Sequence, residues 1–552
     1  MRWLSVLDRV EANPDAPGIR LEAGLHGPAE ELSRHRLLHL AASGAAVFRA
    51  AGVATGDRIV TLLPTGRPLL QAIFGAWHAG AAACVMAPAI EGDRSSLSRE
   101  RLAALLGIVR PKVIVAAESE LGGLSAVAGS LGARLLTVGD LPTDGTGSGP
   151  RSTNQPDDMA FIQFTSGSTG LPKAIVIEHG QLSNHLRVLC RHARFAPSDV
   201  MVSWLPLHHD MGFVGGLLTP VFAQCALVLI PTERFIRDPG TWLSTISDCR
   251  GTLSPAPSFA YKMLTSPVLA RRLRDIDLKS WRFAWIGAEP VSPAIVEAFE
   301  RIYGACGLRP GVLHPSYGMA ETTLGIAITT CDGERRVISI SRRDLQDGGR
   351  AVMTAGALGE ALRLASNGPP LEGMQIEIRG EDGNVLPEGM QGRIFLCGDD
   401  IVRRYFSSDE NPQAGGWLET GDLGFVLDGE IYVTGREKDV IIRGGANVHA
   451  HDVEEAVVRG MPDLAQRAVA FAVPRADDLR DEVVVGVEVR RERLPEGFAG
   501  AVRRAVAHHV GLQVDQVLVL PKGAIPRTTS GKTQRSQARA LFLADRLVPK
   551  PA

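Results

Sequence analysis

A nine-residue segment of the chain has the composition of a phosphate-binding loop. The segment "TSGSTGLPK", residues 165–173, combines glycines that let backbone amides converge on one point, hydroxyl donors, and a positively charged lysine. Apolar runs that are typical of strands flank it on both sides. Most Gly/Ser-rich runs are only flexible hairpin turns, but the flanking runs and the Lys-bearing proline turn favour an anion such as phosphate.

Lysine is scarce, so its positions are informative. Only eight of the 59 basic residues are lysines, and Lys173, Lys438 and Lys532 lie in Gly-rich segments. A position that keeps lysine in an Arg-biased chain favours a compact ammonium group over a forked guanidinium. Lys532 follows Gly531 in a "GKT" sequence, but a Walker-type loop needs a glycine at the position of Pro526. The chain therefore handles phosphate without the usual ATPase loop.

Three successive sequence patterns along the chain indicate the structural elements that must position these residues. From about residue 30 to 330, helix-like segments alternate with runs such as "RIVTLLP", "VIVAA", "ALVLIPT" and "RFAWIGAEP", which predicts a layered α/β fold with mostly parallel strands. From about 355 to 435, short alternating strands and D-G or E-G turns predict a small antiparallel barrel or sheet. Residues 436–552 have the pattern of a compact α+β unit. We therefore predict a large domain, 1–435, and a small domain, 436–552.

Composition excludes several classes of protein. At 552 residues the chain exceeds the roughly 250–300 residues at which single cores stop growing, so it holds two or more domains. A net charge of −2 gives no overall field that would attract nucleic acid or an anionic membrane. The seven cysteines are scattered without a C-x-x-C pair, which argues against a disulfide framework or a zinc site and favours a cytoplasmic location.

Neither apolar candidate for targeting or membrane insertion has the expected form. The N-terminal 21 residues carry charges within their first ten positions, so they predict an amphipathic helix and not a signal peptide. Residues 69–90 are interrupted by Gln71, His78 and Pro88, so a buried helix followed by a strand is favoured over a membrane span.

Five segments in order resemble the adenylate-forming superfamily, which includes acyl-CoA synthetases, luciferase, peptide-synthetase adenylation domains and fatty acyl-AMP ligases. They are "TSGSTGLPK" (165–173), "SYGMAETTL" (316–324), "GWLETGDLG" (416–424), "GREKDVIIRGGANVHAHDVEE" (435–455) and "PRTTSGKTQR" (526–535). The resemblance spans nearly the whole chain. It implies a barrel-like subdomain near 355–435, a mobile C-terminal domain, and attack of a carboxylate on the α-phosphorus of ATP with Mg²⁺ present.

The same resemblance assigns nucleotide-binding residues. It implies that the first loop holds the β- and γ-phosphates through Thr165, Ser166, Gly167, Ser168, Thr169 and Lys173. It implies that Tyr317 and Gly318 contact one face of adenine, that Gly287, Ala288 and Glu289 cover the other, and that Asp422 accepts the ribose hydroxyls. Outside these motifs, Tyr317 would read as a core aromatic and "TGD" as a common turn.

Catalytic roles also follow from the resemblance. Lys532 is expected to touch the substrate carboxylate and the α-phosphate, and Arg436 the ribose or the α-phosphate. Glu321 is expected to hold Mg²⁺, and Lys438 to lie at the hinge about which the small domain turns. The plainer alternatives are a surface acid for Glu321 and solvated helix-end lysines for Lys438 and Lys532.

An acyl pocket is implied by two further segments. The resemblance places His209, Asp210, Met211 and Gly212, together with Ser258 and Phe259, in it. A metal site at His208 and His209 is disfavoured because adjacent histidines point in different directions and no third ligand is near. His449 and His451 are interpreted as surface or packing residues, and Ala450 departs from the proline that the family more often has there.

The branch of the family follows from the acyl segments and from one long connection. The "HDMG" setting of Asp210 is similar to fatty acyl-AMP ligases more than to amino-acid activators. Residues 325–368 form a longer connection than acyl-CoA synthetases usually carry, and long connections are often functional. The resemblance associates such an insertion with poor use of coenzyme A and with transfer to an acyl carrier protein or an acyltransferase.

Three alternatives stay open from the sequence. The connection could be a neutral decoration, or the enzyme could be an acyl-CoA synthetase that completes thioester formation. The chain could also be a catalytically silent, adenylate-binding paralogue, although Glu321, Asp422, Arg436 and Lys532 are all present.

Overall fold

The computed structural model describes most of the chain. The residues outside the description are 1–3, 25–26, 89–95, 144–149, 165–172, 332–334, 357–359, 407, 409, 444–445, 475–480, 491–493, 528–531 and 548–552. The predicted phosphate-binding residues Thr165, Ser166, Gly167, Ser168 and Thr169 therefore lie outside the described residues, whereas Lys173 and Lys532 lie within them.

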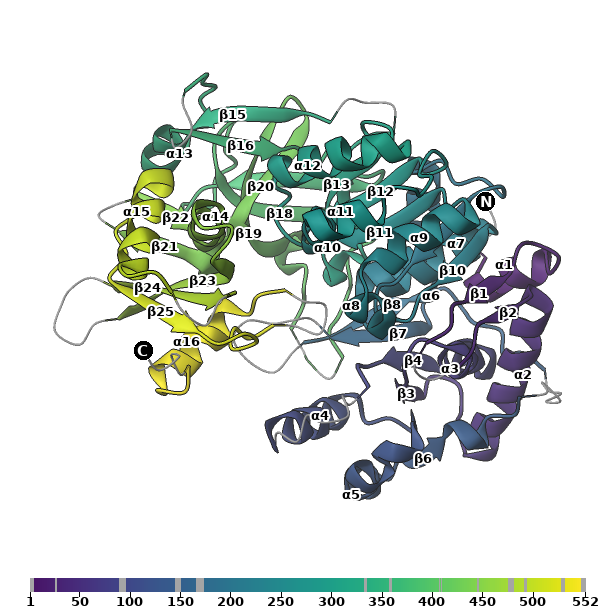
Figure 1. Ribbon diagram of the computed structural model, residues 1–552. Coiled ribbons are helices and arrows are strands. Elements are labelled where there is room, and N and C mark those ends of the chain that lie inside the picture. Colours follow the sequence, from purple (N-terminus) through teal and green to yellow (C-terminus); the bar gives the residue numbers. More distant parts are fainter. Residues whose placement is uncertain are drawn as a thin grey trace.

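Two large, mostly parallel sheets form the body of the protein (Figure 1). The six-stranded sheet has the order β6-β5-β3-β4-β7-β8, and the eight-stranded sheet has the order β14-β13-β12-β11-β9-β10-β1-β2. The first comprises β3 (Arg58–Leu62), β4 (Ala82–Val85), β5 (Val113–Ala116), β6 (Arg134–Thr137), β7 (Met159–Phe164) and β8 (Ala174–Glu178). The second comprises β1 (Ile19–Leu21), β2 (Glu30–Leu32), β9 (Val200–Ser203), β10 (Ala226–Leu229), β11 (Leu253–Pro257), β12 (Phe283–Gly287), β13 (Leu313–Gly318) and β14 (Gly325–Ile328). The predicted α/β layers are confirmed.

Helices of this body connect and cover the two sheets. They are α1 (Val6–Ala12), α2 (Arg34–Ala50), α3 (Arg67–Ala79), α4 (Ser96–Val109), α5 (Leu121–Leu131), α6 (His179–His192), α7 (Thr219–Ala223), α8 (Thr232–Arg237), α9 (Gly240–Cys249), α10 (Ser258–Leu264), α11 (Pro267–Arg272) and α12 (Pro293–Tyr303). The predicted N-terminal helix and the predicted helix and strand of residues 69–90 are present as α1, α3 and β4. Among helices in the described part of the chain, none is both long and apolar enough to cross a bilayer.

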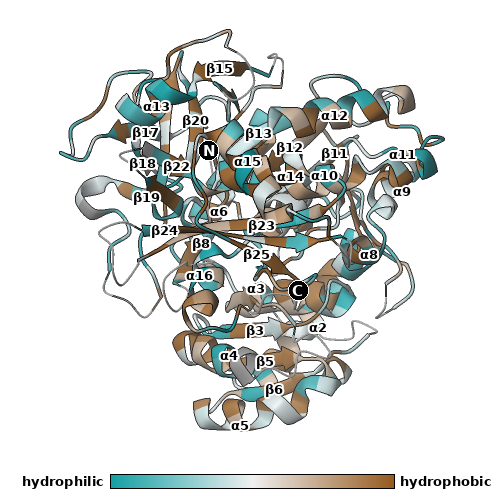
Figure 2. Ribbon diagram, turned by 60° about the vertical axis from the view of Figure 1, so that its left-hand side comes forward, coloured by the Kyte–Doolittle hydropathy of each residue, from teal (hydrophilic) through white to brown (hydrophobic). Residues whose placement is uncertain are grey.

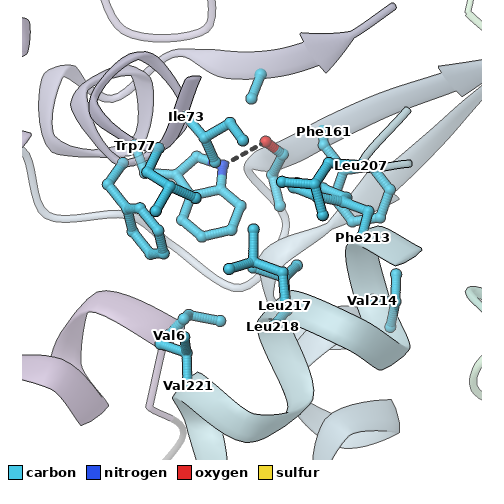
Figure 3. Close-up of a cluster of buried hydrophobic side chains, with 14 of the residues drawn as sticks. Val6, Ile73, Trp77, Phe161, Leu207, Phe213, Val214, Leu217, Leu218 and Val221 are labelled. Atoms are coloured by element: carbon cyan, nitrogen blue, oxygen red, sulfur yellow. Dashed lines mark hydrogen bonds between the residues drawn. The ribbon is translucent and has the colours of Figure 1, made fainter. Parts of the chain in front are cut away.

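The core between the two sheets fixes a π-helix next to the site. This π-helix, η3 (Met211–Leu218), buries all of its residues. Figure 3 shows Trp77, Phe161 and Phe213 meeting in this core, and the Trp77 indole Nε1–H donates to the Ala160 carbonyl oxygen at 2.6 Å. The rings of Phe161 and Phe213 meet edge to face at 5.0 Å. Apolar packing on both sides therefore fixes the start of η3, which is the residue after Asp210.

The region predicted to be barrel-like is a four-stranded antiparallel sheet. It has the order β17-β18-β19-β20, with β17 (Met374–Arg379) and β20 (Glu430–Arg436) at its edges, so the described strands form an open sheet and not a closed barrel. The inner strands are β18 (Gly392–Gly398) and β19 (Leu418–Leu427). The antiparallel pattern read from the D-G and E-G turns is confirmed.

The long connection forms a hairpin and a helix that pack on this sheet. Strands β15 (Val337–Ser341) and β16 (Ala361–Ala365) pair antiparallel, and α13 (Arg342–Gly348) follows β15. Ile340 and Leu345 of this unit share a buried cluster with Phe425 and Tyr432 of the sheet. The connection is therefore ordered structure built onto the third sheet.

The C-terminal segment forms its own small α+β unit, at the yellow end of the chain in Figure 1. Strands β23 (Ala465–Pro474), β24 (Asp481–Val489) and β25 (Gln516–Leu520) form one sheet, and β21 (Val440–Arg443) and β22 (Ala446–His449) form a hairpin. Its helices are α14 (Ala450–Gly460), α15 (Phe498–Val510) and α16 (Arg535–Leu543). Figure 2 shows brown, hydrophobic strands β23 and β24 in its interior. The domain boundary at 435/436 stays a prediction.

Candidate active site

Four parallel strands of the eight-stranded sheet end at the same edge, and predicted site residues follow each of them. His209 and Asp210 come after β9, Ser258 after β11, and Ala288 after β12, while Tyr317 lies at the end of β13. Ligands of open α/β sheets bind outside the carboxyl ends of the strands, so the topology gathers these residues by itself.

A narrow cavity of about 40 Å³ lies at this edge and brings residues of distant segments together. Asp210, Met211, Ala288, Tyr317, Gly318 and Lys532 are the predicted site residues that line it. Lys532 comes from the small unit and the others from the body of the protein. The cavity therefore lies between the two predicted domains.

Asp210 begins the π-helix and is held in its charged form. Asp210 Oδ1 accepts from the Met211 N–H at 2.6 Å, and His209 Nδ1 lies 2.6 Å from the same oxygen. Burial opposes the charge, but His209 and then Lys532 outweigh it and lower the pKa of Asp210 to about 2. A Cβ at Gly212 would lie 2.3 Å from the Pro206 carbonyl oxygen, so only glycine allows this close approach.

The "GAE" segment is fixed by a buried glutamate. Glu289 Oε2 accepts from the Phe259 N–H at 3.2 Å, and burial raises the pKa of Glu289 although Lys532 opposes the shift. Ala288 has a φ of +65°, a left-handed conformation that is uncommon for non-glycine residues. Ser258 and Phe259 support this segment, and they are not among the described residues that line the cavity.

Tyr317 and Asp422 form a direct hydrogen bond. The Tyr317 hydroxyl donates to Asp422 Oδ2 at 2.7 Å, and Arg436 Nε lies 3.4 Å from Asp422 Oδ1. Burial raises the pKa of Asp422, and Arg436 opposes that shift. Tyr317 is only 8% exposed, so its ring forms part of the site wall and not a free surface.

Glu321, the residue predicted to hold Mg²⁺, has the oxygen-ligand chemistry that this ion requires. It lies in η5 (Ala320–Thr322), and burial raises the pKa of Glu321, with Asp210 adding to the shift. Within the described ranges, no group of three His, Cys, Asp or Glu side chains could hold a metal by itself. One hard oxygen ligand with the remaining positions on water and phosphate is the arrangement that Mg²⁺ commonly takes.

Lys532 is partly buried, and the helix after it is tied to the small unit. Burial lowers the pKa of Lys532, and Asp210 opposes the shift. Arg535 donates from Nη1 to Asp439 Oδ2 at 2.7 Å and from Nε to Glu454 Oε1 at 2.7 Å. Asp439 ends the turn η7 (Glu437–Asp439), which carries the predicted hinge residue Lys438 on an exposed surface.

Lys173 is not among the described residues that line the cavity, although its charge lowers the pKa of Glu321 against the effect of burial. Its Nζ is 2.5 Å from Glu410 Oε1 and 4.6 Å from the centre of the Tyr405 ring.

His449, interpreted as a surface or packing residue, is buried, and its ring lies 5.6 Å from that of His451. The structure therefore places Lys173 at the surface and His449 in packing.

Sequence reasoning missed the apolar residues in the wall of the cavity. Trp285, Leu189, Leu324 and Ile328 line it, and the Trp285 indole nitrogen is buried without a hydrogen-bond partner. Strand β12 is buried at every position, so no alternation distinguishes Trp285 from its neighbours.

A larger cavity of about 440 Å³ lies elsewhere, beside β1, α8 and α9. Its wall is charged, and Arg20 and Arg234 both pair with Glu22 there. The predicted site residues are absent from the described lining of this larger cavity, so the narrow cavity is the candidate active site.

Comparison with known proteins adds a family and several relatives to the geometry of the site. The AMP-binding enzyme family matches residues 7–406 of the chain. A Caulobacter vibrioides protein provisionally assigned as an acyl-CoA synthetase is 34% identical, over 90% of this chain and 87% of its own. A medium-chain-fatty-acid–acyl-carrier-protein ligase of Moorena producens is 31% identical, over 88% of this chain and 86% of its own.

Structural similarity covers the whole chain. A structure from studies of fatty acyl-adenylate ligases of E. coli and L. pneumophila has a TM-score of 0.87 and 28% identity, and the match covers 98% of each chain. The match over residues 7–406 shows the family, and the shared motifs and the cavity at the strand ends agree with it. The chain belongs to the AMP-binding enzyme family.

Proposed function

We propose that the protein is an acyl-AMP ligase that activates a hydrophobic carboxylic acid with ATP and passes the acyl group to a carrier protein. The observation that carries the proposal is that Lys532 shares one narrow cavity with Asp210, Ala288 and Tyr317. Its wall also contains the apolar side chains of Leu189, Trp285, Leu324 and Ile328. A wall that combines charged and apolar side chains suits a carboxylate with a hydrocarbon tail.

In the proposed reaction a carboxylate oxygen forms a bond to the α-phosphorus of ATP as the bond to pyrophosphate breaks. Two anions must approach each other, so cationic groups have to offset their repulsion in a site that excludes water. Lys532 supplies that charge beside the carboxylate, and Arg436, 3.4 Å from Asp422, supplies charge near the ribose. A magnesium ion, when bound, neutralises the phosphates, and Glu321 is the residue we assign to hold it.

The acceptor is proposed from the position of the long connection. Arg342 of α13 donates to Asp452 of α14 at 2.9 Å, so the connection contacts the small unit directly. Such a contact stabilises the pose in which Lys532 lines the cavity and disfavours a second pose that would admit a small thiol. A carrier protein can offset this bias through its own differential affinity for the second pose.

The alternative is an acyl-CoA synthetase, the activity provisionally assigned to the Caulobacter vibrioides relative. A third class, a silent adenylate-binding protein, is disfavoured because Lys532, Asp422 and Glu321 are all present. We also propose a cytoplasmic location without a nucleic-acid partner, supported by seven free cysteines and a net charge of −2.

The test is a carboxylate-dependent exchange of labelled pyrophosphate into ATP across a panel of acids. Exchange with medium- or long-chain acids is the expected result, and no exchange with any acid would refute the ligase. Mass spectrometry with coenzyme A, and then with phosphopantetheinyl carrier proteins, decides the acceptor. Fast acyl-CoA formation by the purified protein would establish the alternative.

A further inference from the structure

Helix α6 presents a polar face to the turn that carries Glu321. Gln181, Asn184 and His185 lie three and four residues apart, so they project from the same side of the helix. All three bond to Asp400, which follows β18, or to residues after Glu321. No motif of the sequence identifies these residues with the reaction.

His185 bridges two backbone segments that are far apart in sequence. The Gly325 backbone N–H donates to His185 Nε2 at 3.0 Å, so Nε2 is an acceptor. A neutral ring then carries its proton on Nδ1, which donates to Asp400 Oδ2 at 3.0 Å. The exposed fractions of the two side chains are 1% and 7%, so both bonds are shielded from water. Asn184 completes the set by donating to Asp400 Oδ1 at 2.7 Å.

The turn between Glu321 and Gly325 has a strained backbone. Thr323 has φ and ψ of +66° and −48°, and the Leu324 N–H donates to the Thr322 carbonyl oxygen at 2.7 Å. These are the features of a γ-turn with positive φ, which is rare and strained, and more so for a β-branched residue. Such a conformation persists only where its surroundings hold it.

The surroundings that hold it are the polar face of α6 and the segment after Asp400. Gln181 Nε2 donates to Thr323 Oγ1 at 3.0 Å and to the Asp400 carbonyl oxygen at 2.8 Å. The Val402 N–H donates to the Glu321 carbonyl oxygen at 2.8 Å. The backbone from which the Glu321 side chain projects is thus fixed at Glu321, Thr323 and Gly325.

We propose that His185 and Asp400 are a positioning pair that holds this strained turn and so sets the Glu321 carboxylate where it meets the metal on the phosphates. The inference rests on the proposed use of Mg·ATP. Neither residue touches substrate; both act through the turn. Partners that orient a metal ligand typically change metal affinity or activity about 10–100-fold when they are removed.

The test measures nucleotide binding by calorimetry without any carboxylic acid, so that no reaction occurs. For His185→Ala we expect Mg·ATP affinity to fall about 10–100-fold while the affinity for metal-free ATP stays within twofold of the wild type. Asp400→Asn, which keeps the shape and removes the charge, should fall in the same direction. Pyrophosphate exchange should show a matching rise in the magnesium concentration needed for half-maximal rate.

Two finer variants separate the two bonds of the ring. His185→Asn keeps a nitrogen donor at the δ position toward Asp400, and His185→Gln keeps an oxygen acceptor near the ε position toward Gly325. Each should lose less Mg·ATP affinity than His185→Ala. They also keep the proposal testable if His185→Ala does not fold, as judged by its thermal unfolding midpoint.

The matched control is His192→Gln on the same helix, whose ring Nε2 lies 3.1 Å from the Thr329 carbonyl oxygen, away from the turn. Its Mg·ATP affinity should equal that of the wild type. The proposal is overturned if folded His185 variants bind Mg·ATP normally, if they lose metal-free ATP equally, or if His192→Gln shows the same loss. A wild type that binds Mg·ATP but exchanges no pyrophosphate with any acid refutes the ligase function alone.

Discussion

One side of the cavity is built on one sheet: Asp210 and Ala288 follow its strands, and Tyr317 lies at the end of β13. The other side is formed by Lys532, which comes from the small unit. The sheet side is held by bonds within the body, such as Tyr317 to Asp422 at 2.7 Å. The small unit meets the body through polar contacts, such as Arg342 to Asp452 at 2.9 Å and Ser292 to Glu455 at 3.1 Å. Polar interfaces of this kind are typical of domains that move relative to each other. The comparison leads us to expect that the sheet side of the site is permanent, and we propose that the Lys532 side depends on the pose of the small unit.

The largest expected effect comes from removing Lys532, the residue that the small unit contributes to the site. Lys532→Ala should lower pyrophosphate exchange by about 10²–10³-fold, the scale of losing one preorganised contact to a developing anion. Transfer of a supplied acyl-AMP to the carrier should stay near the wild-type rate, because the sheet side is intact. Lys522→Ala, an exposed lysine of the same unit, is the control. Equal loss of both half-reactions would contradict the two-sided picture.

Acid should lower the free energy of unfolding through the buried side chain of His449. Burial, and then His451, lowers the pKa of His449 from 6.5 to about 4. Between these values the unfolded chain binds a proton that the folded chain does not, so this contribution is full above pH 6.5 and is lost as the pH falls. The slope is about 1.4 kcal/mol per pH unit, or tenfold in the unfolding constant.

Denaturant unfolding of the wild type and of His449→Gln at pH 7 and pH 5 measures this contribution. The variant should lose about 2 kcal/mol less than the wild type over that range, since only about 1.5 units lie below the unfolded pKa. His35→Gln, at an exposed histidine, should behave as the wild type. An unchanged pH dependence in His449→Gln would show that the ring is not protonated on unfolding in this range.

A substitution at Trp285 tests the sheet side of the site through its preference for acids of different length. Trp285→Phe keeps an aromatic ring and removes bulk from the wall of the cavity. The rate ratio for two acids that differ by one methylene should shift toward the longer acid by about tenfold, the lower end of the roughly 1–3 kcal/mol that one methylene is worth in an apolar pocket. Trp281→Phe, at a buried tryptophan outside the described lining, is the control. An unchanged ratio would remove Trp285 from the acyl pocket.

The smallest expected effect comes from removing one contact between the long connection and the small unit. Arg342→Ala should raise acyl-CoA formation by a few-fold and leave pyrophosphate exchange nearly unchanged, because this pair is one of several polar contacts that bias the two poses and it touches no reacting group. Arg343→Ala, whose side chain is 89% exposed, is the control. Deletion of residues 332–350 should act in the same direction more strongly. A parallel fall in exchange and thioester formation would mean that the connection is only structural.

The layered body could be predicted from the sequence, because the alternation of helix-like and strand-like segments is a local feature, whereas the shared edge of the sheet on which the site residues lie follows from the strand order. Ser258 and Phe259 were expected to line the acyl pocket, whereas Phe259 supports Glu289 through its N–H at 3.2 Å. The pair of His185 and Asp400 could not be predicted, since it joins residues 215 positions apart through tertiary packing. Trp285 was hidden because β12 is buried throughout. The roles of the site residues stay predictions until the variants are measured.

The bond from Arg535 to Asp439, at 2.7 Å, bears on the direction of the overall reaction. It ties the helix that begins three residues after Lys532 to the turn of the predicted hinge, and we expect the two to move together. Rotation at Lys438 would withdraw Lys532 from the acyl-AMP in the same motion that opens space for the acceptor. The group that assists pyrophosphate departure would then be absent when pyrophosphate could return. The activated acid would be protected from reversal while it waits for its acceptor.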